Sequence, residues 1–150
     1  MSEELPMTLT RSAVKLTHRG ASTILAAAVD AAEAMGVPQC IAVVDEGCNL
    51  MAFIRMDGAR VLSIESATRK AMTAATTGQP TGGISPDKAL LLAEATSGKM
   101  TNLLGGLPLL VDGQVVGGIG VGSGTGEQDL EIAKAAIAAF ERKIKEGQSR

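Results

Sequence analysis

His18 is the only histidine of the 150-residue chain. Its imidazole ordinarily changes charge near neutral pH, so it could move a proton in catalysis or bind a haem iron or a cobalt through nitrogen. His18 also falls among apolar residues at helical spacing, where a polar ring needs a partner in the core, at an interface or in a bound ligand. The sequence leaves the ligand-binding and the core or interface interpretations open.

Charged side chains stand where strands, turns and helices are expected to begin or end: Asp45, Arg55, Asp57, Lys70 and Asp129. Arg55 and Lys70 could bind a carboxylate, and Asp57, Asp129 or His18 could move a proton. For each residue alone, a surface ion pair or a helix cap is the simpler role. No nucleophile elbow accompanies the histidine, so a Ser-His-Asp hydrolase is not indicated.

A glycine-rich stretch, Gly117–Gly126, fits neither the dinucleotide fingerprint nor the phosphate-binding loop. Its second half leads into an expected helix, whose first N–H groups could hold an anion through Gly122, Gly124 and Thr125. In the alternative, Thr125 or Asp129 caps that helix. Glycines within the strand imply close approach by another backbone, a subunit or a ligand.

Composition excludes several classes of function. With a net charge of -2, the chain lacks the excess of basic residues that is typical of nucleic-acid-binding proteins. It has no Trp or Tyr, which argues against stacking on nucleic-acid bases and against an aromatic belt at a membrane interface. The acidic start, residues 1–6, does not resemble a secretory signal, so we expect a cytoplasmic protein without a membrane partner. Cys40 and Cys48 should not meet across their hairpin, where Cys40 would face a residue near Phe53, so we expect reduced thiols.

Hydrophobic periodicity predicts four helices, over about residues 10–35, 61–76, 86–94 with Ser85 as the N-cap, and 126–146. Two β-hairpins are predicted, 40–45 with 50–56 and 107–111 with 114–121, the second closed by the turn Asp112-Gly113. Residues 78–83 are expected to form a mobile loop. Because hairpins rather than crossover units supply the strands, the predicted fold is an α+β domain with an antiparallel sheet, spanning 1–150 with its core at about 8–146.

Five motifs occur in a fixed order over residues 8–145: Val44-Asp-Glu-Gly-Cys-Asn-Leu50, Arg55-Met-Asp-Gly58, Lys70-Ala-Met-Thr-Ala74, Gly105-Gly-Leu-Pro108, and Gly117–Gly124 with Glu127-Gln-Asp129. Together they resemble the GlcG/HbpS-like family of haem-binding and haem-degrading proteins. That family includes the C-terminal domain of PduO-type cobalamin adenosyltransferases. One departure is Cys48, where the family commonly has glycine.

The resemblance implies a profilin-like α/β/α sandwich with a five-stranded antiparallel sheet, and self-association to a dimer or octamer. It also implies a haem or cobalamin ligand, with a helix-borne histidine as metal ligand in some members and His18 as its counterpart. Three functions stay open: a haem- or corrinoid-binding protein with a haem-degrading or sensing role, an isomerase or lyase acting on a small carboxylated metabolite, and an accessory subunit. In the first, Arg55, Lys70 or the last helix N-terminus would hold propionates, and a Thr or Met could replace His18 as the ligand.

Overall fold

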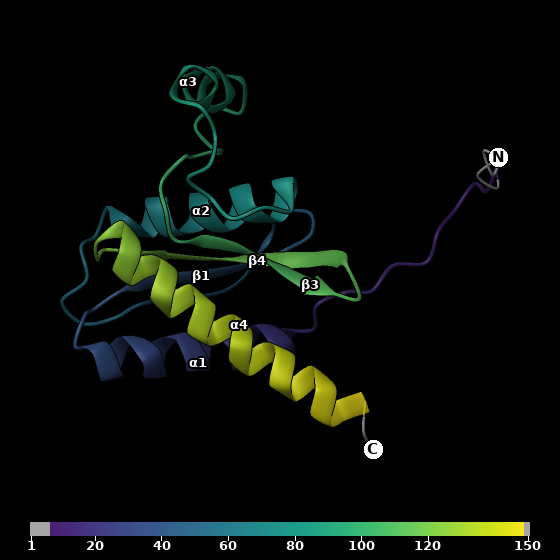
Figure 1. Ribbon diagram of the computed structural model, residues 1–150, viewed down its shortest axis with the longest axis horizontal. Helices are drawn as coiled ribbons and strands as arrows, with labels where there is room; N and C mark the ends of the chain where they lie inside the picture. The colour runs from purple at the N-terminus through teal and green to yellow at the C-terminus, as the bar shows by residue number, and fades with distance from the viewer. Residues whose placement is uncertain (1–6, 149–150) are drawn as a thin grey trace.

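Two β-hairpins join edge to edge into one antiparallel sheet (Figure 1). Strands β1 (Cys40–Asp45) and β2 (Leu50–Arg55) form the first hairpin, and β3 (Gly106–Val111) and β4 (Gln114–Gly122) form the second. The strand order is β2-β1-β4-β3, so β1 and β4 are central and β2 and β3 are edges. Both predicted hairpins are therefore confirmed, within a residue at their ends.

This computed structural model describes residues 7–148, and the acidic start at 1–6 lies outside them. Its sheet has four strands, so the expectation of five was wrong. The segment at residues 7–17 has no regular secondary structure and does not pair with a sheet edge. Its first residues lead away from the body of the domain (Figure 1), whereas Leu16 is buried in the main core. The antiparallel α+β class is confirmed.

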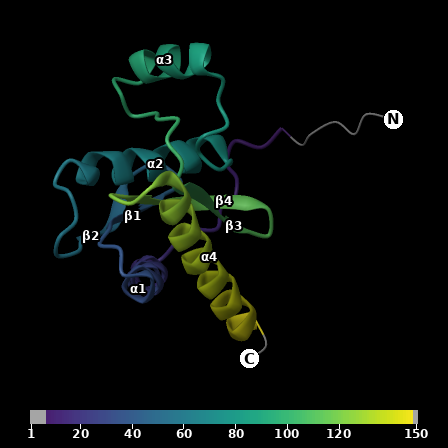
Figure 2. The same cartoon turned by 60° about the vertical axis from the view of Figure 1, so that its left-hand side comes forward.

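Helices cover both faces of the sheet. Helix α2 (Ser63–Thr77) lies on one face, and α1 (His18–Met35) and α4 (Gly126–Gln148) lie on the other, which gives three layers (Figures 1 and 2). A fourth helix, α3 (Pro86–Ala95), stands clear of these layers. Between residues 7 and 148 no helix has the length and apolar character of a bilayer-crossing segment.

The core is aliphatic and differs between the two faces. Under α1 and α4 it contains large side chains such as Ile24, Ile119 and Ile132, whereas under α2 it consists mainly of alanines and glycines. A methyl group added at Gly118 or Gly120 would meet the main-chain oxygens of Ala71 and Ala67 on α2. The close approach expected at the glycine-rich strand is therefore made by helix backbone.

Turn chemistry explains the hairpin ends. Asp112 and Gly113 have φ angles of 49° and 77°, the left-handed pair that a two-residue turn requires. Cys48 in the first hairpin turn has a φ of 65°, a conformation that glycine adopts more easily. In the ladder Cys40 pairs with Arg55, two positions beyond the expected Phe53. Both cysteines are free, as predicted.

Helix α1 begins at His18, so the predicted start near residue 10 was wrong. The Thr17 side chain accepts a hydrogen bond of 3.0 Å from the Gly20 N–H and caps the helix. The apolar spacing continues back to Val14, but that side chain is 48% exposed and lies outside the helix. Spacing alone could not show where the cap interrupts the pattern.

Candidate functional site

The predicted site residues lie at two distant places in the fold. At one end of the sheet Cys40 pairs with Arg55 on β2 and with Gly122 on β4, so these two residues flank the same backbone position. Arg55 and Asp57 share a shallow cavity of about 270 Å³ with Glu33 of α1. Glu33 follows His18 by fifteen residues of continuous helix, a rise of about 22 Å. The structure therefore separates Arg55 from His18.

Lys70 and Asp129 form a buried ion pair. Lys70 Nζ lies 2.9 Å from Asp129 Oδ2 and donates a second hydrogen bond of 2.8 Å to the Val121 carbonyl. The side chains are 5% and 2% exposed. Gly105 lies against the pair, since a methyl group there would come within 2.8 Å of Asp129 Cβ. The pair joins α2, β4 and α4, and neither group reaches the surface where a ligand would arrive.

The N-terminus of α4 is capped by its own side chains. Thr125 Oγ1 accepts from the Gln128 N–H at 3.2 Å, and Gln128 Oε1 accepts from the Thr125 N–H at 2.9 Å, which is a reciprocal capping box. The Gly124 N–H donates to Asp129 Oδ1 at 3.0 Å and to Gln39 Oε1 at 3.1 Å. The sequence left open whether this turn binds an anion or caps the helix, and the hydrogen bonds show that it caps the helix.

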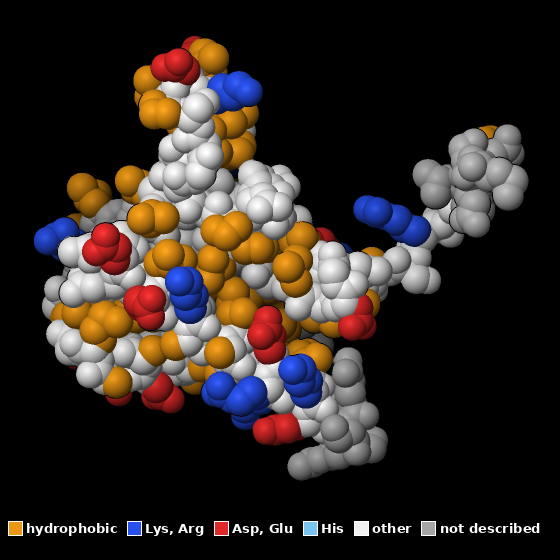
Figure 3. Space-filling model, in the orientation of Figure 1, with side chains coloured by type: hydrophobic (Ala, Val, Ile, Leu, Met, Phe, Trp, Pro, Cys, Tyr) orange, Lys and Arg blue, Asp and Glu red, His pale blue; other side chains and the backbone are white. Residues whose placement is uncertain are grey.

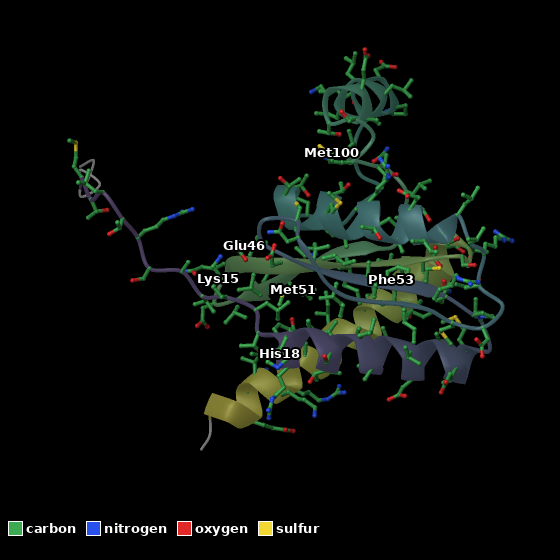
Figure 4. All side chains as sticks on the ribbon, turned by 180° about the vertical axis from the view of Figure 1, so that it is seen from behind. Lys15, His18, Glu46, Met51, Phe53 and Met100 are labelled. Carbon is green, nitrogen blue, oxygen red and sulfur yellow. The ribbon has the colours of Figure 1, made fainter. Side chains whose placement is uncertain are left out.

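His18 is exposed as the first residue of α1 (Figure 4). Its ring makes no hydrogen bond or ion pair with residues 7–148, and it lines none of the four cavities named in this section. The buried face of α1 consists instead of Ala21, Ile24, Ala28 and Ala32. The core interpretation of His18 was therefore wrong, and the ring is open to a ligand or to another chain. Arg19, the next residue, is also exposed.

Two cavities lie beside α2. One of about 560 Å³ is lined by threonines of α2 and by Pro80, Ile84 and Leu104. The other, of about 380 Å³ and here called the methionine cavity, is lined by Cys48, Met72, Lys99 and Met100 among others. Two other methionines, Met51 and Met56, pack against the main core, and Met56 also lines the cavity beside Arg55 and Asp57. A third cavity, of about 350 Å³, lies between α4 and Leu110.

The cysteine thiols are partly or fully covered. Cys48 Sγ donates to the Met72 carbonyl at 3.4 Å, and burial, followed by the Asp45 charge, raises the pKa of this thiol. Burial also raises the pKa of Cys40, against an opposing effect of Arg55. Both groups therefore stay protonated at neutral pH.

The groups proposed for acid-base catalysis do not converge. Within residues 7–148 no hydrogen bond, ion pair or cavity described above joins any two of His18, Asp57 and Asp129. Nor do three His, Cys, Asp or Glu side chains gather there as a metal site. Gln39 was missed by sequence reasoning: it is fully buried and its Nε2 has no partner in this part of the chain. The sequence gives no sign of this, because nothing around a single glutamine before a strand shows that its side chain will be buried.

Comparison with known proteins shows which family the chain belongs to. A family model described as haem degrading protein HbpS-like matches residues 16–138. The chain belongs to the HbpS-like family. Corrinoid adenosyltransferase PduO of Citrobacter freundii is 36% identical over 133 residues, covering 85% of this chain. This chain spans 40% of the length of that relative.

Solved structures of similar proteins share the fold. Klebsiella pneumoniae protein ORFY has a TM-score of 0.84 and 30% identity, over 91% of this chain and 98% of the other. The PduOC:heme complex has a TM-score of 0.77 and 34% identity, over 84% of this chain and 95% of the other. The resemblance deduced from the five motifs is confirmed.

Proposed function

We propose that this protein binds haem or a corrinoid, with a haem-degrading or sensing role. The observation that carries the proposal is the close likeness in fold and sequence to PduOC, whose solved structure is a haem complex. The HbpS-like family description points the same way. An isomerase or lyase is disfavoured because the candidate acid-base groups lie apart, and a buried Lys70 cannot clamp a substrate carboxylate.

His18 is the proposed axial ligand. A haem iron or a cobalt needs a neutral imidazole nitrogen that it can approach, and the exposed ring at the start of α1 meets that need without rearrangement. Arg19 adds an exposed cation beside it for a propionate or phosphate group. Lys70 is buried and Arg55 lies near the far end of α1, so neither fits a tetrapyrrole held by His18.

Titration with hemin and, in parallel, cobalamin tests the proposal by visible absorption. We expect a Soret band that saturates near one haem per chain. His18→Ala should weaken binding at least about tenfold, which corresponds to a loss of about 1.4 kcal/mol, or change the spectrum of the bound iron. Arg55→Ala is the matched control and should leave both unchanged.

The outcomes separate the parts of the proposal. Titration that never saturates, and is the same in all variants, would contradict specific binding. Saturation that His18→Ala leaves unchanged would retain the binding function but refute His18 as ligand. Loss of the Soret band when reductant and oxygen are added to the complex would support degradation, and a stable band would favour sensing.

We also propose that copies of the chain associate, as the family resemblance implies, and that the protein acts in the cytoplasm. Support for association comes from the neighbouring leucines Leu90 and Leu91, which are 77% and 66% exposed in a single copy.

A further inference from the structure

Helix α3 has no buried residue, although its sequence contains three consecutive leucines. Both ribbon views show it standing apart from the three layers (Figures 1 and 2). Leu90 and Leu91 are 77% and 66% exposed. A helix of ten residues is marginal in water on its own, because most helical stability in proteins comes from packing an apolar face. The exposed leucines therefore indicate a missing packing partner.

The arm that carries α3, residues 82–104, is anchored at its base. Asn102 Oδ1 accepts from the Ile84 N–H at 2.9 Å, while Asn102 Nδ2 donates to the Ile84 carbonyl at 2.6 Å. Next to Asn102, on the segment that leads back from α3, the Thr101 N–H donates to Thr73 Oγ1 of α2 at 3.0 Å. These bonds fix the direction in which α3 projects, so its exposed face is presented in a set geometry.

The same chain offers a surface that suits this face. The methionine cavity opens beside α2 and the base of the arm, and Met72 and Met100 give it an adaptable apolar wall (Figure 4 places Met100 between α2 and α3). Lys99 also lines it and makes no ion pair within residues 7–148. In α3, Asp87 and Glu94 lie one turn to either side of the leucines, and apolar side chains gather over this helix (Figure 3).

We propose that α3 is the self-association element of the protein: Leu90 and Leu91 of one copy pack over the methionine cavity of a second copy, and the second copy returns the same contact. A twofold arrangement uses each arm and each cavity once, which is the self-complementary pattern of a symmetric dimer. Glu94 at the edge of the leucine face then meets Lys99 of the second copy. This inference deepens the proposed self-association, and it does not depend on haem binding.

A second copy fits better than an unrelated partner. Arm and cavity occur in one chain with matched apolar character, and Asp87 and Glu94, which flank the leucines of α3 at helical spacing, are opposite in charge to Lys99 of the cavity. The net charge of -2 is too small to keep copies apart.

Sedimentation velocity of the full-length, ligand-free protein tests the inference. We expect the unaltered chain to sediment as a multiple of 15.3 kDa. The double variant Leu90→Lys, Leu91→Lys should dissociate at least about tenfold more readily while its far-UV circular dichroism stays unchanged. Leu62→Lys is the matched control, since Leu62 is 79% exposed but lies at the start of α2, and it should keep the parent mass.

A charge exchange keeps the test decisive if the leucine variant fails to fold. Glu94→Lys and Lys99→Glu should each weaken association, and the two together should restore it. A monomeric parent chain, a leucine variant with the parent mass, or dissociation of the Leu62 control to the same degree would each overturn the assignment. The hemin titration is run separately on the same variants, so a failure of haem binding is distinguished from a failure of this contact.

Discussion

The ion pair between Lys70 and Asp129 should be the most sensitive polar contact in the domain. Lys70→Met is expected to lower the free energy of unfolding by about 3–5 kcal/mol, because the Asp129 carboxylate then stays buried without its cation. The side chains are 5% and 2% exposed, so water cannot take the place of the lost partner. The Val121 carbonyl also loses a donor at 2.8 Å. Such a loss is a large part of the 5–15 kcal/mol that stabilises a typical domain.

The double variant Lys70→Met, Asp129→Leu removes both charges, and it should cost less than the sum of the two single changes. Its Gly124 N–H retains Gln39 Oε1 as an acceptor. Urea unfolding followed by far-UV circular dichroism is the assay, since a chain without Trp or Tyr lacks the usual fluorescence probe. Arg69→Met, which breaks an exposed pair with Glu65, should cost no more than about 1 kcal/mol.

Two results would refute this reasoning. A cost below about 1 kcal/mol for Lys70→Met would mean that the carboxylate finds water or another partner. Single costs that simply add in the double variant, within about 0.5 kcal/mol, would mean that the two groups are not coupled.

Further predictions concern packing, the arm and the thiols. Gly120→Ala should destabilise the fold by about 3 kcal/mol in the same urea assay because its methyl group overlaps α2 backbone, whereas Gly83→Ala, with open space around it, should not. Asn102→Ala should speed limited proteolysis within residues 82–104 by removing both bonds to Ile84, and an unchanged cleavage rate would contradict the anchoring role. Burial raises the pKa of Cys40, so the free energy of unfolding should fall as pH rises past the ordinary thiol pKa; Cys40→Ala should flatten that slope, and equal slopes would disprove it.

Local signals predicted much of the fold. The Asp112-Gly113 turn, flanked by apolar runs, identified the second hairpin because few other residue pairs accept two left-handed positions. Glu65 and Arg69 are four residues apart, a spacing that favours an ion pair on a helix, and the structure has this pair on α2 at 3.2 Å. In each case the interacting residues are neighbours in sequence, so pattern and geometry carry the same information.

The long-range features could not be predicted in this way. Lys70 and Asp129 are 59 positions apart, and nothing in either neighbourhood shows that they meet. Each was singled out because it stands at an element boundary, yet the fold buries both. His18 was placed on a buried stripe because the pattern extended through Val14, and the Thr17 cap, a feature of three-dimensional geometry, changed that outcome.

The contact between β4 and α2 constrains how this protein can change over evolutionary time. In an ordinary core a larger side chain can be accommodated when its neighbour becomes smaller. At Gly118 and Gly120 the neighbouring atoms are the main-chain oxygens of Ala71 and Ala67. Every residue has a main-chain oxygen, so no substitution on α2 can remove these atoms. Space for a larger side chain could be made only by moving the whole helix. These two positions should therefore remain glycine even where the surrounding sequence diverges.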